Sequence, residues 1–264
     1  MVEAHNIFPE KLPRSPSRRT MVQTHDIERP SKALVEGLSK IGSATATGEL
    51  SRMGVSDPQI LGPLPYTTGK SICGPAITLQ YMPMREDLYP QEEYKDPEKQ
   101  LHRHALYHTQ PGDVVVVDAR GDMSSGVFGS MMLTYFQGRG GAGIVIDGVI
   151  RDVEEASKLD IGMWLRGVSP NHHTQTNIMP FAVNEPIACG GTLVMPGDIV
   201  IADDDGAVNV PIALAQQLFE NASTHVEWEE FTRLRLLEGG DLRKYYPLRD
   251  DARAEYEEWK KTQG

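Results

Sequence analysis

An adjacent arginine and aspartate, Arg151 and Asp152, are the residues of this sequence best placed to do chemistry. They follow an apolar run at residues 143–147 and stand directly before a predicted helix that begins at Val153. In α/β proteins, the groups that contact a ligand lie where a strand ends and leads into a helix. A guanidinium binds a carboxylate through paired hydrogen bonds, and an aspartate binds hard divalent cations. The alternative is that Asp152 only caps the helix while Arg151 forms a surface ion pair.

A glycine-led segment, GVFGSMM at residues 126–132, precedes this pair and opens another predicted helix. Backbone N–H groups at such a helix start can hold a carboxylate or a phosphate. The sequence has neither a GxGxxG nor a GxxxxGK[ST] pattern, so we do not expect a nucleotide. Together, the two features predict a pocket in which Arg151 and backbone amides bind a substrate carboxylate. The amides expected there are those of Gly129, Ser130, Met131 and Met132.

Beside that carboxylate, Asp152 would bind a divalent cation, because such a cation accepts a mixture of carboxylate and water ligands. A cation next to a 2-oxo group acts as a Lewis acid and stabilises an enolate. The pattern therefore predicts a carboxylate and cation site, which is suited to enolate chemistry on a substrate with a 2-oxo group.

Other motifs give weaker predictions. His172 and His173 are adjacent, which is not the spacing of a zinc pair, and the sequence has no HExxH or CxxC; we expect a loop there, at the rim of a pocket. The acidic turn at residues 203–206 lacks the closing glutamate of a calcium loop. Cys73 and Cys189 lie far apart in apolar surroundings, as is typical of a reducing compartment. No G-x-S-x-G elbow predicts a serine hydrolase.

The composition limits the class of protein. The chain has 264 residues, 39% of them hydrophobic, which is enough for a packed core. Its net charge of -11 would repel phosphate backbones, so we expect no nucleic-acid partner. No run reaches the roughly 18 apolar residues of a membrane helix, and the first residues lack the apolar core of a signal peptide. We therefore expect no membrane partner and a cytoplasmic location.

Strands and helices are predicted to alternate in the centre of the chain. Apolar runs at residues 113–118 and 143–147 predict buried strands, and residues 126–137 and 153–159 predict helices that follow them. This alternation with short loops is typical of an α/β layer. After Gly162, short strands spaced by glycine and proline predict a small barrel packed on that layer.

The chain divides into three predicted parts. Residues 1–29 are polar and contain prolines, which predicts a flexible N-terminal arm. Residues 30–222 form the central domain, and residues 223–264 a C-terminal helical extension. The polar segment at residues 83–99 interrupts the central domain and is expected to be a solvated loop.

Several stretches carry a resemblance to a known family. They read GDVVVVDARGDMSSGVFGSMM, GGAGIVIDGVIRDVEEASKLDIGMW and GGTLVMPGDIVIADDDGAVNVP, supported by TATGELSRMG and GPAIT. These stretches resemble the RraA-like family, which includes the class II 4-hydroxy-4-methyl-2-oxoglutarate/4-carboxy-4-hydroxy-2-oxoadipate aldolases. The resemblance runs from about Pro30 to Gly240. It implies an α/β fold: an α-β-β-α sandwich with a central small β-barrel of the swivelling β/β/α type, plus the C-terminal helical extension.

The resemblance also implies roles for individual residues. In the aldolases of the family, the arginine that matches Arg151 contacts the pyruvoyl oxygens, and the aspartate that matches Asp152 holds Mg²⁺ or Mn²⁺ largely through water. A glutamate from the C-terminal helix of a neighbouring subunit approaches the metal, and Glu229 or Glu230 is the best match here. Such proteins assemble as homotrimers or as homohexamers, which are dimers of trimers. The small-molecule partner would be a 2-oxo acid.

One departure from the family pattern leaves the reaction open. The glycine-rich turn of the family usually reads Gly-Asp, whereas this chain has Gly129-Ser130. We expect a metal-dependent lyase (a class II pyruvate aldolase) that releases pyruvate and decarboxylates oxaloacetate as a side activity. One alternative is a dehydratase or hydrolase that acts on a sugar-derived 2-oxo acid through the same enolate site. Another is a non-catalytic regulator of the ribonuclease E inhibitor type.

Overall fold

The two apolar runs predicted as buried strands lie next to each other in the middle of a large sheet. They form the first parts of β4 (Val114–Gly126) and β5 (Gly143–Ile150), which pair in parallel. Val115 of β4 packs into one core and Val116 into another, so this strand is buried on both faces. The computed structural model describes residues 24–86, 95–172 and 177–263.

The sheet joins a parallel half to an antiparallel half. β3, β4, β5 and β6 are parallel neighbours, and β10 and β11 extend the sheet from β3 in antiparallel order. In spatial order, the strands are β1 (Gln59–Ile60), β11 (Gly206–Val210), β10 (Ile199–Asp203), β3 (Ile72–Pro83), β4, β5, β6 (Gly162–Val168) and β2 (Leu64–Pro65). β7 (Ile178–Val183) pairs with β3, while β8 (Ile187–Cys189) and β9 (Thr192–Val194) form a separate hairpin.

This sheet curls around a core that its two ends share. Ile60 of β1, Ala207 of β11 and Trp164 of β6 all belong to one buried cluster, to which the β8–β9 hairpin also contributes. The Trp164 indole N–H donates a hydrogen bond to the carbonyl of Asp203 in β10 at 2.8 Å. β3, β4 and β5 lie between β6 and β10 in the sheet, so this bond spans the interior of the curl. The strands after Gly162 were expected to form a small barrel packed on the α/β layer, whereas β6, β10 and β11 belong to one curled sheet with β3, β4 and β5.

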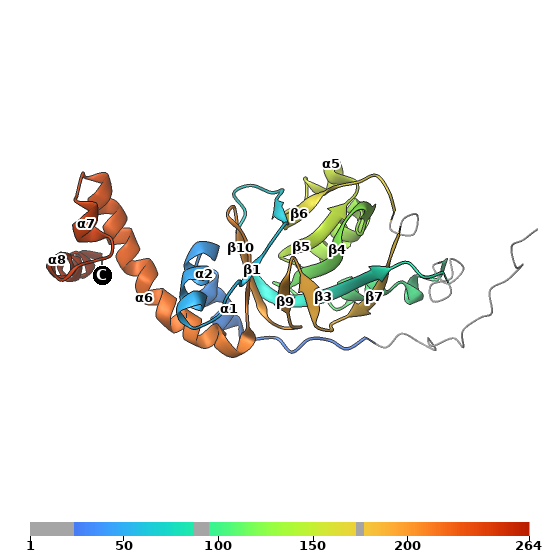
Figure 1. Ribbon diagram of the computed structural model, residues 1–264, viewed down its shortest axis with the longest axis horizontal. Helices are drawn as coiled ribbons and strands as arrows, with labels where there is room; N and C mark the ends of the chain where they lie inside the picture. The colour runs from blue at the N-terminus through green and yellow to red at the C-terminus, as the bar shows by residue number, and fades with distance from the viewer. Residues whose placement is uncertain (1–23, 87–94, 173–176, 264) are drawn as a thin grey trace, which may run out of the picture.

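Helices cover the outside of the curled sheet on two sides (Figure 1). α3 packs on β3 and β7, with α4 and α5 beside it over the same core, and α1, α2 and the first half of α6 pack on β10 and β11. The helices are α1 (Lys32–Leu38), α2 (Ser43–Arg52), α3 (Leu101–Tyr107), α4 (Ser130–Gly138), α5 (Val153–Ala156), α6 (Ile212–Leu237), α7 (Leu242–Tyr245) and α8 (Asp250–Gln263), with a 3-10 helix η2 (Pro97–Lys99) before α3. The predicted α/β class is confirmed, with helices on both sides of the curled sheet.

Two elements differ from the expectation. β4 continues to Gly126, so the helix predicted from residue 126 begins at Ser130. β7 was not predicted; Pro180 lies within it, and proline is rare in internal strands. Among the described strands, β7 pairs with β3 alone, so one of its edges has no strand partner and can hold a proline.

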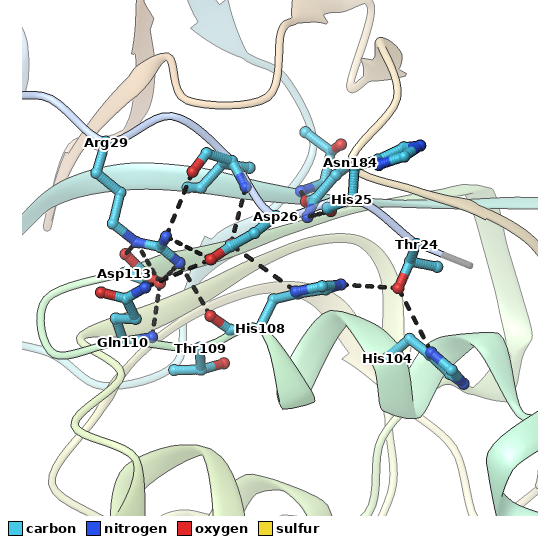
Figure 2. Close-up of polar contacts among 12 residues, drawn as sticks. Thr24, His25, Asp26, Arg29, His104, His108, Thr109, Gln110, Asp113 and Asn184 are labelled. Carbon is cyan, nitrogen blue, oxygen red and sulfur yellow. Dashed lines mark hydrogen bonds and ion pairs between the residues drawn. The ribbon is translucent and has the colours of Figure 1, made fainter. Parts of the chain in front are cut away.

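The predicted arm at residues 1–29 is described from Thr24 onward, and this part lies against the body (Figure 2). Arg29 binds Asp113 with two nitrogens: Nη2 lies 2.8 Å from Oδ2 and Nε lies 3.0 Å from Oδ1. Ile27 is buried in the core beneath α3. The side chain of Asp113 is fully buried, and that of Arg29 is 19% exposed. Burial opposes the charge of Arg29, but its hydrogen bonds to Asp113 and Asp26 prevail and raise the pKa of the guanidinium.

Further contacts attach the same segment to α3 and to the turn after β7. The hydroxyl of Thr24 lies 2.7 Å from Nε2 of His108, and the side-chain amide of Asn184 donates to the carbonyl of His25 at 2.7 Å (Figure 2). Arg29 also donates to the carbonyl of His108 at 2.9 Å. Residues 24–29 are therefore held by side chains from several elements of the body. The division of the chain at residue 29 stays a prediction.

The C-terminal half of α6 projects away from the sheet and carries α7 and α8 (Figure 1). The helix runs without interruption across residue 222, where the central domain was predicted to end. Beyond that residue, Phe231, Tyr245 and Tyr256 form the buried centre of a small aromatic cluster. Within the described residues, none of the helices combines the length and apolar character needed to span a bilayer.

Candidate active site at the carboxyl end of strand β5

Arg151 and Asp152 lie directly after β5, where the sequence predicted them to be. Asp152 occupies the N-cap position of α5, but its side chain makes no capping hydrogen bond there. Its backbone is left-handed, with φ of 57°. That conformation costs energy for any residue with a Cβ, although aspartate tolerates it better than most. Capping of α5 therefore does not explain this aspartate.

The carboxylate of Asp152 points at the N-terminus of a different helix. The backbone N–H of Ser130, the first residue of α4, donates to Oδ2 of Asp152 at 3.3 Å. The positive end of the α4 dipole also favours a negative charge at this place. A left-handed backbone at the end of one strand thus aims a carboxylate at the start of the preceding helix.

Gly129 allows this approach because it has no side chain. A Cβ at this position would lie 2.7 Å from Oδ2 of Asp152 and 3.0 Å from Nε of Arg151. The backbone of Gly129 is extended, with φ of -112°, so space and not backbone conformation demands glycine. The turn and the Arg151–Asp152 pair were selected separately from the sequence, and the structure brings them together.

Arg151 is held at its backbone and remains open at its guanidinium. Its N–H donates to the carbonyl of Phe128 at 3.0 Å, which ties the end of β5 to the turn before α4. Its Nε lies 3.8 Å from Oδ2 of Asp152, and the two side chains are 39% and 42% exposed. A guanidinium has five donors, so this long contact leaves capacity for an anionic ligand.

A pocket of about 70 Å³ opens beside these residues. It is smaller than the roughly 300–1,000 Å³ typical of sites for drug-sized ligands, but it has room for a few water molecules or a small acid. Its lining consists of His102, Gly126, Val127, Gly129, Met131, Met132, Arg151, Asp152 and His172. The titratable side chains of this lining are the Arg151–Asp152 pair and the two histidines.

The four backbone amides predicted to bind a carboxylate do not have equal roles. The N–H of Ser130 is directed at Asp152, and the N–H of Met132 donates to the carbonyl of Gly129 at 3.1 Å. Among the hydrogen bonds between described residues, none is recorded from the N–H of Gly129 or Met131. The N–H groups of Gly129 and Met131 are therefore the ones left for a ligand, and the carboxylate contacts of all four residues stay a prediction.

Glu229 and Glu230 do not line the pocket of their own chain. They lie on the projecting half of α6, whereas the pocket lies at the opposite end of the molecule, near α5 (Figure 1). Their assignment to the site of a neighbouring subunit stays a prediction. His173, the second histidine of the predicted loop, lies outside the described residues, while His172 does line the pocket.

The residues present can be compared with the needs of a divalent metal ion. Asp152 is the single carboxylate among the lining residues, and no group of three or more potential ligands occurs in the described part of the chain. Such a set does not fit zinc, which needs three or four protein ligands. It fits Mg²⁺, which keeps several waters and is bound through one or two carboxylates. Asp152 would be the residue that holds such an ion.

Sequence reasoning missed His102 as a lining residue. It lies in the first turn of α3 and is 2% exposed, whereas the sequence shows it as one of several histidines in a short helix. No local pattern separates His102 from His104 or His108. Its place in the pocket results from the packing of α3 beside α4 and β7.

Together, the fold and this pocket define an α/β protein with a small pocket, lined by Arg151 and Asp152, at the carboxyl end of a parallel strand. A family model described as Aldolase/RraA (RraA-like) matches residues 44–209. The chain therefore belongs to the RraA-like family.

The curated relatives of this chain carry different descriptions. The chain is 35% identical over 118 residues to the "Putative 4-hydroxy-4-methyl-2-oxoglutarate aldolase" of Halalkalibacterium halodurans, a match that covers 45% of this chain and 55% of that protein. It is 32% identical over 130 residues to an uncharacterized protein of Methanocaldococcus jannaschii, covering 49% and 62%. This chain thus spans little more than half the length of these curated relatives.

Solved structures show the same fold over more of the chain. One is RraAS2 of Streptomyces coelicolor, described as an unusual member of the RNase ES inhibitor RraA protein family. It is 42% identical, with a TM-score of 0.72, and the match covers 79% of this chain and 99% of that one. An uncharacterized protein of Pseudomonas syringae pv. tomato is 22% identical, with a TM-score of 0.70 over 83% of this chain and 99% of its own, and shows the fold alone.

Proposed function

We propose that this protein is a divalent-metal-dependent lyase that cleaves a small 4-hydroxy-2-oxo acid and releases pyruvate. The observation that carries the proposal is the position of Asp152, whose left-handed backbone turns its carboxylate away from α5 and into a small pocket beside Arg151. The chain belongs to a family that includes an aldolase by name, which supports a lyase over other enolate chemistry.

The residues of the chain can each take a part in this reaction. Arg151 binds the carboxylate and the 2-oxo oxygen of the substrate and stabilises the negative charge that develops on that oxygen as the enolate forms. The N–H groups of Gly129 and Met131 add hydrogen bonds to the carboxylate. The small volume of the pocket limits the number of waters beside the enolate.

Asp152 would hold Mg²⁺ or Mn²⁺ through its carboxylate. When bound, such an ion supplies a Lewis acid next to the 2-oxo group. Cleavage of a 4-hydroxy-2-oxo acid and decarboxylation of oxaloacetate both leave the same pyruvate enolate. The same site is therefore expected to decarboxylate oxaloacetate as a side activity.

The proposal includes a homo-oligomer, a trimer or a dimer of trimers. Glu229 or Glu230 of one subunit would approach the metal of its neighbour, which agrees with the projection of α6 away from its own pocket. Light scattering coupled to size exclusion measures the oligomer directly. A monomer that retains full activity would contradict this part of the proposal.

The decisive experiment is pyruvate release from oxaloacetate and from 4-hydroxy-2-oxo acids. Pyruvate is expected with added Mg²⁺ or Mn²⁺, and it should disappear with a chelator and in Asp152→Ala. Glu154→Ala, a change of an acidic residue in the first turn of α5, is a matched control that should keep the activity. A well-folded protein that releases no pyruvate from any of these substrates, with or without metal, would rule out the lyase.

A second candidate is a regulator that binds a ribonuclease of the E type. The 42% identity to a member of the RNase ES inhibitor RraA family favours it. A pure binder does not need the carboxylate of Asp152 in the pocket. Inhibition of the ribonuclease by the wild type and equally by Asp152→Ala, without pyruvate release, would establish the regulator in place of the lyase.

A further inference from the structure

The pocket contains two histidines to which the proposed lyase gives no role. His102 comes from α3 and His172 from the segment after β6. Together with Arg151 and Asp152, they are the titratable side chains of the lining. Cleavage of a 4-hydroxy-2-oxo acid requires a group that accepts the proton of the 4-hydroxyl. Arg151 cannot accept it, because a guanidinium has no acceptor and stays protonated.

Hydrogen bonds to β4 and β5 fix the position of His172. Gly126 forms a β-bridge with His172, and its N–H donates to the carbonyl of Asn171 at 2.9 Å. The hydroxyl of Ser169 donates to the carbonyl of Ser124 at 3.1 Å, while its N–H donates to the carbonyl of Ile150 at 2.9 Å. The chain leading to His172 is thus attached to the two strands that end at the pocket.

Gly126 brings this segment close to Arg151. A Cβ on Gly126 would lie 2.7 Å from the carbonyl oxygen of Asn171 and 3.1 Å from Cβ of Arg151. The backbone before His172 and the base of the Arg151 side chain therefore both lie close to Gly126. Arg151 and His172 line the same small pocket, so a substrate held there by Arg151 lies near His172.

The surroundings of His172 favour the neutral form of its imidazole. Burial lowers the pKa of His172, and the positive charge of Arg151 lowers it further. The other titratable groups of the pocket are Asp152 and His102. His172 is partly exposed and can exchange a proton with water, whereas His102 is 2% exposed within the packing of α3.

We propose that His172 is the catalytic base that removes the proton of the distal hydroxyl group of the substrate. This inference rests on the proposed lyase function. The hydroxyl proton moves to the imidazole, and the O–H electron pair forms the carbonyl of the departing fragment. The bond between carbons 3 and 4 breaks, and its electron pair forms the pyruvate enolate. The imidazolium then returns the proton to carbon 3, which yields pyruvate and the neutral histidine.

Comparison of two substrates tests this role. Oxaloacetate has no hydroxyl proton to remove, and water can protonate the enolate left by loss of carbon dioxide. In His172→Asn, cleavage of a 4-hydroxy-2-oxo acid should fall about 10²–10⁴-fold, the usual contribution of a general base, while oxaloacetate decarboxylation should fall less than about tenfold. His25→Asn is the matched control, since His25 is an exposed histidine outside the pocket.

Two further readouts separate catalysis from a structural effect. Added imidazole should restore part of the cleavage activity in His172→Ala. The wild-type cleavage rate should fall at acidic pH, with a midpoint below the ordinary histidine pKa of about 6.5. The pH–rate profile of His172→Asn should lack this acidic limb. Equal losses on both substrates, or no loss on either, would overturn the role of His172 and leave the lyase standing. Absence of both activities in the wild type would overturn the lyase itself and this inference with it.

Discussion

The molecule contains two arginine–aspartate pairs that are built from the same side chains and have opposite environments. Arg29 binds Asp113 through two short hydrogen bonds, and that aspartate is fully buried. Arg151 and Asp152 lie 3.8 Å apart, and each side chain is about two-fifths exposed. In the first pair, the charges satisfy each other. In the second, each charge keeps room for another partner.

The difference shows how the same chemistry serves folding in one place and ligand binding in another. Asp113 also accepts a hydrogen bond from the N–H of Gln110 at 2.7 Å, so its carboxylate is almost fully used by the protein. Asp152 has the N–H of Ser130 at 3.3 Å and a strained backbone. We therefore expect loss of the Arg29–Asp113 pair to affect stability and loss of the Arg151–Asp152 pair to affect activity.

The largest effect is expected from Asp113→Ala. Removal of one partner of a buried pair typically costs about 3–5 kcal/mol of the free energy of unfolding, because the other charge is left without its counter-ion. Urea denaturation measures this loss. Asp26→Ala, which removes the exposed carboxylate on the other side of Arg29, should cost at most about 1 kcal/mol. Similar losses in the two variants would show that the pair is not a structural anchor.

The second effect concerns Asp152→Asn. Pyruvate release should fall by about 100-fold or more, since the change removes the proposed metal-binding charge. The free energy of unfolding should change by less than about 1 kcal/mol, because the carboxylate is exposed and asparagine tolerates a left-handed backbone. A large loss of stability with retained activity would reverse the comparison between the two pairs.

A third change sharpens the comparison by filling the space between helix and carboxylate. Gly129→Ala places a methyl group 2.7 Å from the Asp152 oxygen, which forces the turn or the carboxylate to move. Activity should fall at least about tenfold, and stability by about 1–3 kcal/mol, as is usual for overpacking. Gly138→Ala, in the last turn of the same helix, meets no atom within 4 Å and is the matched control. Equal effects of the two alanines would show that the approach at Gly129 does not matter.

The smallest effect is a pH dependence of the segment that carries Arg29. Burial lowers the pKa of His108, although Asp26 acts in the opposite direction. A histidine with a lowered folded pKa stabilises the fold above its unfolded value of about 6.5, and this contribution is lost as the pH falls through the folded pKa. Tm should therefore drop more between pH 7 and 5 in the wild type than in His108→Asn. Identical pH profiles would exclude His108 as a contributor.

Sequence patterns predicted the open pair and missed the buried one, for a physical reason. Arg151 and Asp152 stand at a strand end and beside a glycine-rich turn, and both signals are local. Arg29 and Asp113 are 84 residues apart, and no local sequence pattern near either residue predicts their contact. The sequence therefore placed residues 24–29 in a flexible arm, whereas the structure packs them on the body.

The same reasoning separates the parts of the fold that sequence could and could not predict. The apolar runs of β4 and β5 gave the central strands, because burial on both faces leaves an unbroken hydrophobic signal. β7 was harder to predict because it contains Pro180, and a proline in a strand is tolerated only where the strand lies at an edge. His102 reached the pocket through the packing of α3, which no pattern of neighbouring residues encodes.

Because α6 is one uninterrupted helix, it fixes both the distance and the rotation of the aromatic cluster relative to the curled sheet. A helix of 26 residues is about 39 Å long at 1.5 Å per residue, and each residue turns it by about 100°. The direction in which Glu229 and Glu230 face is therefore determined by the residues of α6 that pack on β10 and β11. Insertion of one residue into α6, between the part that packs on the sheet and Glu229, would rotate the aromatic cluster and both glutamates by about 100°. The pocket of the same chain would not change.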